Sequence, residues 1–186
     1  MRTSNEDHTG HAAPREAAQR PTLRAEVHGD PQRGWQFFVV GNVDLLAEPL
    51  LGLIASRECP GHVLLETLER VPAWVAESRV LVSGFHSPLE QQVLRSLLRR
   101  DGRAVMVLAR GMSRYRPSPD ERAALAASRL LVLTAFPPSV QRITRDNALA
   151  RNRLVTSLAT KLCVPYMTDN SPLAEIARLA APASSQ

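Results

Sequence analysis

Short apolar runs alternate with longer amphipathic stretches from Phe37 onward. The runs have the length of buried strands and are rich in Val, Leu and Ile. They are Phe37–Val40, Leu50–Ala55, Val80–Val82, Ala104–Leu108, Leu130–Thr134 and Leu162–Tyr166. Strands separated by helical stretches are typical of a parallel sheet with helices on its faces. The pattern therefore predicts an α/β fold, in which a mostly parallel sheet in a single domain carries helices on both faces.

Helix starts are marked by capping residues. The runs Ser87–Glu90 and Ser118–Glu121 each place Ser at the N-cap, Pro at the first helical position and Glu at N3, which predicts a capping box in both. A last helix is predicted to begin at Ser171. Residues 62–78 have helical periodicity interrupted by Pro72, so we expect one bent helix there.

The first 34 residues lack this pattern. They are rich in polar residues, Ala, Pro and Gly without sustained periodicity. Such a segment cannot bury enough apolar surface to offset the entropy of ordering it. We therefore expect a flexible tail over residues 1–34, one folded domain over residues 35–181 and a frayed end over residues 182–186.

Length and cysteine content indicate one ordinary domain. A chain of 186 residues can bury a sizeable core. Cys59 and Cys163 lie far apart and lack the paired Cys/His spacing of a zinc site or a disulfide framework. The first thirty residues hold no apolar run of signal-peptide type, and no stretch approaches the roughly 20 apolar residues of a membrane span. We expect a soluble, cytoplasmic protein without metal or cofactor.

The net charge of +5 is carried almost wholly by arginine, because Lys161 is the only lysine. Residues 1–36 contain five arginines and five acidic residues, so that segment is neutral. The positive excess lies in the remainder of the chain, which is where a site for a polyanion would have to form.

The predicted strands end in residues suited to an anionic ligand. In an open parallel sheet, ligands bind beyond the carboxyl ends of the strands, where the free N–H groups of helix N-termini favour anions. Of the four predicted strands that end at residues 55, 82, 108 and 134, three are followed by a hydroxyl, a glycine or an arginine suited to phosphate. The candidate phosphate-binding residues are Ser56, Arg57, Ser83, Gly84 and Arg110, and Phe136 is a candidate for stacking a base.

A basic segment from Arg142 to Arg153 extends the candidate site. If Thr144 caps a helix, steps of about 100° per residue divide it into two faces. The polar face holds Arg145, Leu149, Asn152, Arg153 and Thr156, and the apolar face holds Ala150, Leu154 and Leu158. We expect the apolar face to pack and the polar face to meet a ligand or water, and we add Arg151, Asn152 and Arg153 to the candidates.

Structural roles stay open for several of these residues. Arg57 either contacts a phosphate or forms a salt bridge with an acid near the end of its strand. Ser83-Gly84 presents amides to an anion, forms a tight turn with positive φ at Gly84, or does both. Phe136 either stacks a base or packs in the core. Glu90 is expected to be a capping-box partner.

Five motifs in sequence order resemble those of the DNA-processing protein A (DprA/Smf) family. They are Gly41-Asn42 followed by Leu45-Leu46, the strand ending in Ser56-Arg57, the strand ending in Ser83-Gly84, the strand and glycine turn Val105–Met112, and Phe136-Pro137-Pro138 followed by Arg151-Asn152-Arg153. The resemblance covers roughly residues 38–166. Ala55 stands where the family has glycine, and Phe85–Glu90 replaces its Gly-Ile-Asp continuation. The chain thus resembles a divergent, short member.

The resemblance implies a Rossmann-like core that binds single-stranded DNA. It also implies a role in DNA processing, DNA uptake and recombination, in which DNA is handed to a RecA-type recombinase. Members of the family pair through their cores, so a homodimer is implied as well. Arginines 57, 110, 151 and 153 would contact the phosphate backbone, while Ser56, Ser83 and Gly84 would supply short hydrogen bonds.

No catalytic motif accompanies these residues. None of the nine glycines is adjacent to another or spaced as Gly-x-Gly, so the Rossmann fingerprint, the P-loop and the Pro-Gly-Gly motif of phosphoribohydrolases are absent from the sequence. For His62 and His86 we expect an ordinary polar contact. The leading hypothesis is a non-catalytic module that binds single-stranded DNA. The alternatives are a nucleotide-binding sensor or phosphoribohydrolase-like protein of a related Rossmann-like family, and a partner-binding subunit that has lost its ligand site.

Overall fold

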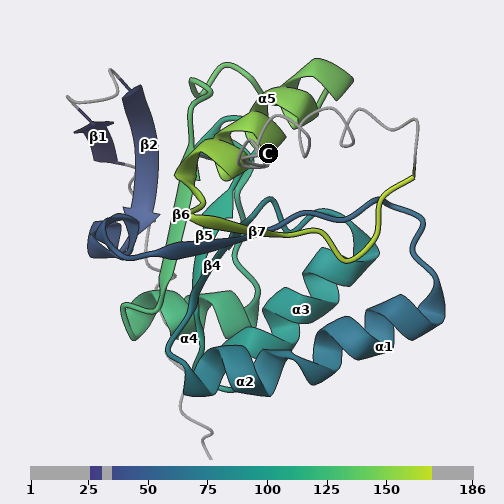
Figure 1. The fold of residues 1–186 in the computed structure, drawn as a ribbon. Coiled ribbons are helices and arrows are strands. Elements are labelled where there is room, and N and C mark those ends of the chain that lie inside the picture. Colours follow the sequence, from purple (N-terminus) through teal and green to yellow (C-terminus); the bar gives the residue numbers. More distant parts are fainter. Residues whose placement is uncertain (1–25, 31–34, 169–186) are drawn as a thin grey trace, which may run out of the picture.

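The computed structural model describes residues 26–30 and 35–168, and these form one seven-stranded sheet (Figure 1). Its strands are β1 (Glu26–Asp30), β2 (Trp35–Gly41), β3 (Leu50–Leu53), β4 (Val80–Ser83), β5 (Arg103–Val107), β6 (Leu130–Thr134) and β7 (Lys161–Cys163). Their order is β1-β2-β6-β5-β4-β3-β7. Strands β3 to β7 are parallel, and β1 and β2 add an antiparallel edge. The predicted mostly parallel sheet is confirmed.

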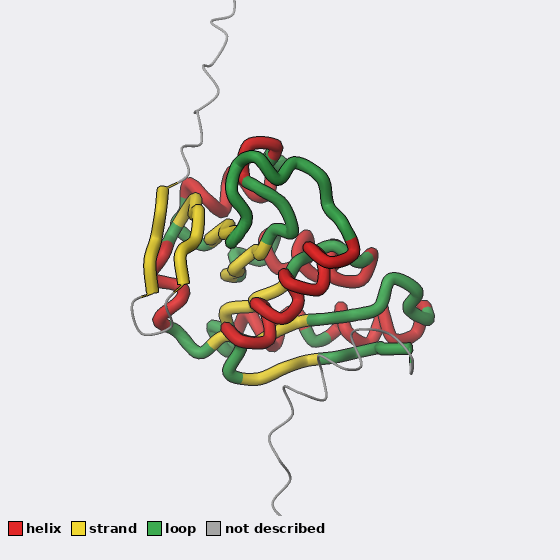
Figure 2. The backbone as a smooth tube through the Cα atoms, turned by 90° about the horizontal axis from the view of Figure 1, so that it is seen from above, coloured by secondary structure: helices red, strands yellow, loops and turns green. Residues whose placement is uncertain are grey.

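Helices cover both faces of this sheet, as predicted. One face carries α1 (Gly61–Glu69), α2 (Val71–Ala76), α3 (Pro88–Leu98) and α4 (Pro119–Ala126), and the other carries α5 (Arg145–Leu158) (Figure 1). Two short 3-10 helices, η1 (Val43–Ala47) and η2 (Met112–Arg114), lie in the connections. Figure 2 looks down onto α5, which crosses the strands and has long loops beside it.

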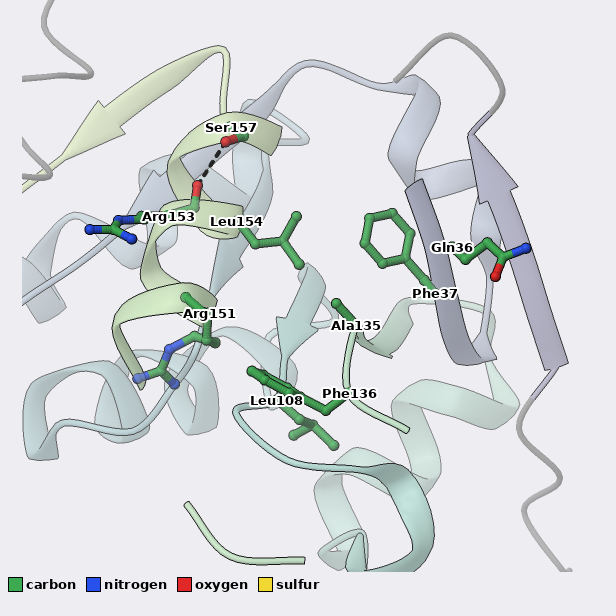
Figure 3. A pocket seen from close by; sticks show the side chains of 10 residues that line it. Gln36, Phe37, Leu108, Ala135, Phe136, Arg151, Arg153, Leu154 and Ser157 are labelled. Atoms are coloured by element: carbon green, nitrogen blue, oxygen red, sulfur yellow. Dashed lines mark hydrogen bonds between the residues drawn. The ribbon is translucent and has the colours of Figure 1, made fainter. Parts of the chain in front are cut away.

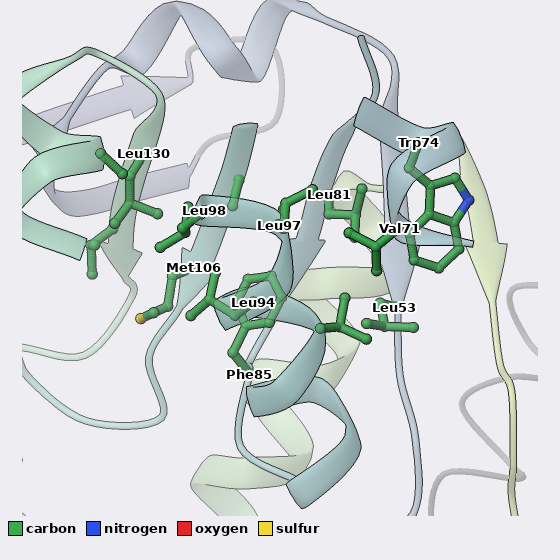
Figure 4. Packing of buried hydrophobic residues seen from close by; sticks show 14 of the residues in the cluster. Leu53, Val71, Trp74, Leu81, Phe85, Leu94, Leu97, Leu98, Met106 and Leu130 are labelled. Atoms are coloured by element: carbon green, nitrogen blue, oxygen red, sulfur yellow. The ribbon is translucent and has the colours of Figure 1, made fainter. Parts of the chain in front are cut away.

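Strand residues alternate between two apolar cores, one on each face. In β4, Leu81 belongs to the core beneath α1 to α4, whereas Val80 and Val82 belong to the core beneath α5. Figure 4 shows the first core, where Leu97 of α3 and Val71 of α2 meet the sheet. Because both faces are covered, both sets of strand residues are buried, which explains the unbroken apolar runs in the sequence.

The predicted helix starts are confirmed. Ser87 and Ser118 each form a capping box with the Glu three residues later. Thr144 caps α5, since its Oγ1 accepts a hydrogen bond from the amide of Asn147 at 3.1 Å. The prediction of one bent helix over residues 62–78 is wrong: α1 and α2 are separate helices. Pro72 lies in the first turn of α2, where an amide has no partner within the helix and proline is tolerated.

The amino-terminal edge also differs from expectation. Glu26–Asp30, inside the predicted tail, forms β1 and pairs with β2. The pairing is made by backbone groups, which composition does not reveal. The rest of that tail, the helix predicted from Ser171 and the predicted frayed end over residues 182–186 lie outside the described residues.

Candidate nucleic-acid interface

Two hollows adjoin where β4, β5 and β6 end beside α5. The first, of about 380 Å³, has mainly apolar walls, and we call it the apolar hollow. It is lined by Gln36, Phe37, Leu108, Ala135, Phe136, Ala150, Arg151, Arg153, Leu154 and Ser157. The second, of about 570 Å³, we call the arginine groove, because its lining includes Arg95, Arg99, Arg110, Arg114, Arg116 and Arg151. Leu108 and Arg151 line both hollows, so the two are adjacent.

Arg151 is the buried cation at this junction. It is 7% exposed and lies on the inner side of α5, one turn before the buried Val155. Its guanidinium rests against Gly84 so closely that a Cβ there would lie 1.8 Å from Nη1. Its Nε donates to Oδ1 of Asn152 at 2.7 Å. Burial lowers the pKa of Arg151, and the nearby carboxylate of Glu90 opposes this.

The predicted division of α5 into faces is confirmed for Leu154 and Leu158, which pack on the core, and for Arg145 and Arg153, which are exposed, but it is wrong for Ala150. The inner side holds Arg151 and Val155, whereas Ala150, assigned to the packing face, is exposed. Arg151 and Arg153 are two residues apart, about 200° around the helix axis, and Arg153 is exposed. Figure 3 shows Arg153 and Leu154 on opposite sides of α5. The triplet 151–153 therefore presents its two arginines in different directions. Of these two arginines, only Arg151 lines both hollows.

The turn after β4 is built differently from the predicted glycine turn. The positive φ, 45°, occurs at Phe85 rather than at Gly84. Ser83 is fully buried, and its Oγ accepts a hydrogen bond from the amide of Phe85 at 3.0 Å, which holds the turn in this shape. Gly84 is needed because only a residue without a side chain leaves room for the guanidinium of Arg151.

Glu90 ties the ends of β3 and β4 together. The residue is 5% exposed. Its Oε1 accepts from the amide of Ala55 at 2.9 Å, and its Oε2 accepts from the amides of His86 at 2.8 Å and Ser87 at 3.3 Å. The predicted capping role is thus confirmed, and the bond to Ala55 adds a second role. Both loops are fixed by one carboxylate.

Ser56 and Arg57 have different surroundings. Ser56 is buried, with its amide donating to the carbonyl of Tyr166 and its Oγ accepting from the amide of Thr168 at 3.3 Å. Arg57 is exposed, and its Nη2 lies 3.4 Å from Nε2 of His86, which lines the arginine groove. Arg57 and Arg151 both act electrostatically on His86, so the structure brings these two predicted residues to one cluster.

Arg110 and Phe136 lie on the two loops that follow β5 and β6. Arg110 lines the arginine groove, and its Nη2 donates to the carbonyl of Arg114 at 3.4 Å. Phe136 is partly buried, next to Leu108 in the wall of the apolar hollow (Figure 3). The loops meet at Gly111, where a Cβ would lie 2.4 Å from the carbonyl oxygen of Pro137. Their contact fixes the relative positions of the two hollows.

Several residues that line the arginine groove were not predicted from the sequence, because the prediction considered only the strand ends and the helix that begins after Thr144. Arg95 lies on α3 and Arg99 is the C-cap residue of that helix, four positions later, while Arg114 and Arg116 flank Tyr115 after β5. Both pairs are visible in the sequence, and the interval of four residues is the one that places two side chains on the same side of a helix. Arg99 also forms an ion pair with Asp120 at 3.0 Å. The hydroxyl of Tyr115 donates to Glu121, and burial together with this carboxylate raises the pKa of Tyr115.

Other site types find no support in residues 26–30 and 35–168. This part of the chain contains no group of three or more His, Cys, Asp or Glu residues arranged to hold a metal ion. None of its helices has the length and apolar character needed to cross a membrane. Cys59 and Cys163 are free thiols, and burial raises the pKa of both.

Sequence comparison identifies similar proteins. Residues 16–184 match the family described as DNA recombination-mediator protein A. The chain is also 26% identical over 128 residues to the DNA processing protein DprA of Streptococcus pneumoniae, a stretch that covers 68% of this chain and 45% of that protein.

Solved structures share the fold. The X-ray structure of DNA processing protein A from Streptococcus pneumoniae matches with a TM-score of 0.65 and 23% identity, over 78% of this chain and 51% of that one. DNA processing protein A from Helicobacter pylori, whose structure is described as giving insight into a unique single-stranded DNA binding mode, matches with a TM-score of 0.64 and 21% identity, over 78% and 66%. The chain spans about half the length of the S. pneumoniae relative.

Proposed function

Because the chain belongs to the DNA recombination-mediator protein A family, we propose that it is a non-catalytic module that binds single-stranded DNA during DNA processing and recombination. The observation that carries this proposal is the junction at Arg151, where a groove with six arginines adjoins a hollow with mainly apolar walls. Single strands are bound by this combination, because arginines contact the phosphates and apolar or aromatic side chains contact the unstacked bases.

The roles divide between the two hollows. Arg57, Arg110 and Arg151 contact the phosphate backbone, joined by Arg114 at the exposed rim of the arginine groove. Phe136 provides an apolar wall for a base. Gly84 and Asn152 act through Arg151, the first by leaving it room and the second by accepting its Nε–H. Ser56 and Ser83 position the loops, because their hydroxyl oxygens accept hydrogen bonds from backbone amides.

The hydrogen bonds of the carboxylates and hydroxyls near the groove support a binding role in which no covalent bond is broken. The buried carboxylate of Glu90 accepts three backbone N–H bonds, and that of Glu121 accepts from Tyr115 and from the amide of Ser118. The hydroxyl groups of Ser56 and Ser83 are buried. These groups stabilise loops and helix caps, so none of them is poised as a nucleophile with a base beside it.

The partners we propose follow from the family. A RecA-type recombinase is the proposed recipient of the bound strand, and a homodimer is the proposed assembly. Light scattering coupled to size exclusion tests the second proposal, with a dimer mass expected. Accelerated assembly of a recombinase on DNA coated with single-strand-binding protein tests the first. A monomer mass, or recombinase assembly that the protein does not change, contradicts the respective proposal.

A fluorescence-anisotropy titration tests the function itself. Labelled single- and double-stranded oligonucleotides are titrated at 50 and 200 mM salt with the full chain. We expect preference for the single strand and, for about four phosphate contacts, affinity that falls about 50-fold between the two salt concentrations. Arg151→Gln should weaken binding. The matched control is Arg79→Gln, which removes the same charge at the opposite end of β4, where Arg79 pairs with Glu77.

The possible outcomes separate the candidate functions. No affinity for oligonucleotides at low salt contradicts the proposal, as does equal loss of affinity in both variants. Binding of mononucleotides that displaces the oligonucleotide at equal concentration would instead favour a nucleotide sensor.

A further inference from the structure

His86 stands where three elements of the proposed binding site meet. It lies in the turn between β4 and α3, is half-buried and lines the arginine groove. Arg57 approaches it from the loop after β3, and Arg151 approaches from α5.

Hydrogen-bond chemistry fixes the state of this imidazole in the unbound protein. The contact is Arg57 Nη2 to His86 Nε2, at 3.4 Å. An arginine side chain can only donate, so this contact is a hydrogen bond only when Nε2 accepts, which requires a neutral ring with its proton on Nδ1. A protonated ring would place two donors against each other. The contact with Arg57 therefore favours an uncharged His86 in the free site.

The charges around the ring favour the same state. Burial lowers the pKa of His86, the guanidinium groups of Arg151 and Arg57 lower it further, and the carboxylate of Glu90 on α3 opposes them. The other charged groups that line this groove are Arg95 and Arg99 on α3, Arg110, Arg114 and Arg116 on the loop after β5, and Asp120 and Glu121 at the start of α4. Asp120 is paired with Arg99, and Glu121 is bound by Tyr115. The positive charges therefore dominate.

We propose that His86 is a further phosphate ligand of this chain, which binds the single strand in its protonated form and releases Arg57 to the same phosphate. This inference rests on the proposed function and deepens it. A phosphodiester between Arg57 and Arg151 brings a negative charge to the ring and reverses the balance there. Nε2 takes a proton from solvent and becomes a donor to a phosphate oxygen. No covalent bond other than this N–H changes, and the complex gains one proton.

The sign of the pH dependence follows from the two states. The pKa of His86 is below its ordinary value in the free protein and is higher in the complex. Protonation therefore strengthens binding fully at pH values below the free-protein pKa. The gain is lost as the pH rises through the pKa of the complex, above which affinity no longer depends on pH. A rise of one pKa unit on binding corresponds to about a tenfold change in affinity.

Isothermal titration calorimetry of the full chain tests this directly. A single-stranded oligonucleotide without terminal phosphates is used, because phosphate monoesters titrate with a pKa of about 6. Titrations at pH 6 in two buffers of different ionisation enthalpy report proton uptake. We expect net uptake in the natural chain and affinity that is several-fold weaker at pH 8 than at pH 6, approaching but not reaching tenfold for a rise of about one pKa unit. His86→Gln should show less uptake and little pH dependence. His62→Gln, on the exposed start of α1, should behave like the natural chain.

The outcomes distinguish this inference from the proposed function. If the oligonucleotide binds and His86→Gln leaves both the proton uptake and the pH dependence unchanged, His86 is not a proton-linked ligand, while the proposed function stands. If no oligonucleotide binds at any pH, the proposed function itself is wrong. If His86→Gln binds more weakly by the same factor at pH 6 and pH 8, the residue acts without a proton and the inference is overturned.

Discussion

The two faces of the sheet are covered in different ways. On one face, α1 to α4 bury a continuous core in which Leu97 and Val71 are fully buried. Among the described residues, the other face is covered by one α-helix, α5 (Figure 2). Along the inner side of α5, Arg151 lies one turn before Val155. Where the first face continues with leucines, the second ends in a buried cation beside two hollows.

This difference teaches that stability and ligand binding are concentrated in different places, the first in the closed core beneath α1 to α4 and the second in the two hollows at the strand ends. A covered face contributes burial of apolar surface, which favours folding in proportion to its area. At the strand ends, the arginine groove lies between Arg151 of α5 and residues of α3 and α4, so side chains there can contact a ligand. Substitutions should therefore separate into those that change the free energy of unfolding and those that change affinity for the proposed single strand.

The largest effect should come from the fully covered face. Leu97→Ala removes a side chain with no exposed surface. The cavity should lower the free energy of unfolding by about 2–5 kcal/mol, measured by urea denaturation. Affinity of the folded protein for the oligonucleotide should not change. Leu65→Ala, at a position 62% exposed, is the control and should have almost no effect. An unchanged free energy of unfolding in Leu97→Ala would contradict the claim that the core beneath α1 to α4 carries the stability.

Gly84→Ala should affect binding more than stability. The added Cβ would lie 1.8 Å from Nη1 of Arg151, so the guanidinium must leave its place. Loss of one charged hydrogen-bonding group costs about 1.5–3 kcal/mol, so affinity should fall at least tenfold in an anisotropy titration. Gly61→Ala is a matched control, because a Cβ at Gly61 meets nothing within 4 Å. Equal affinity in the two variants would contradict a role for Arg151.

Glu90→Gln tests the residue that connects the two loops. The carboxylate of Glu90 accepts hydrogen bonds from the amide of Ala55 at one oxygen and from the amides of His86 and Ser87 at the other. In Gln, an NH2 group replaces one of these oxygens and would face backbone N–H groups that it cannot accept from. Buried N–H groups left without acceptors should lower the free energy of unfolding by about 1–3 kcal/mol, measured by thermal denaturation. Glu121→Gln changes the same capping position on α4, where the residue is partly exposed, and should cost less. The reverse order would show that Glu90 is only a helix cap.

The smallest effect is expected at the rim of the arginine groove. Arg114 is exposed, so Arg114→Gln should leave the free energy of unfolding unchanged. If it contacts one phosphate, the slope of log affinity against log salt should become shallower by about 0.7. The slope is measured by titration over a salt series, with Arg79→Gln as the control for loss of charge alone. An unchanged slope in Arg114→Gln would place the strand elsewhere in the groove.

Much of the fold could be predicted because its determinants are local. The apolar runs, the two serine capping boxes and Thr144 at the start of α5 all act over a few residues, and the structure confirms them. Strand β1 escaped prediction because Glu26–Asp30 has no apolar alternation of its own. Its place depends on backbone pairing with β2, which is a property of the assembled sheet.

The site was predictable in outline but not in orientation. Strand-end position identified Arg57, Gly84 and Arg110 as lining or neighbouring one groove. Counting residues around an isolated helix separates Arg151 from Arg153, but it cannot show that Gly84 leaves room for a buried guanidinium on the packing side. The positive φ at Phe85 also escaped, since a buried aromatic holds a conformation there that the local sequence assigns to glycine.

Residue-by-residue mapping of the bound strand tests the central claim most directly. Uniformly 15N-labelled protein is titrated with a single-stranded oligonucleotide, and amide chemical shifts are followed by NMR. We predict that the largest shifts occur at Gly84, Leu108 and Phe136, which line the two hollows. Amides of Val71 and Trp74, in the core beneath α1 to α4, should not shift. Shifts confined to that second group would show that the strand binds the opposite face, and the proposed interface beside α5 would be wrong.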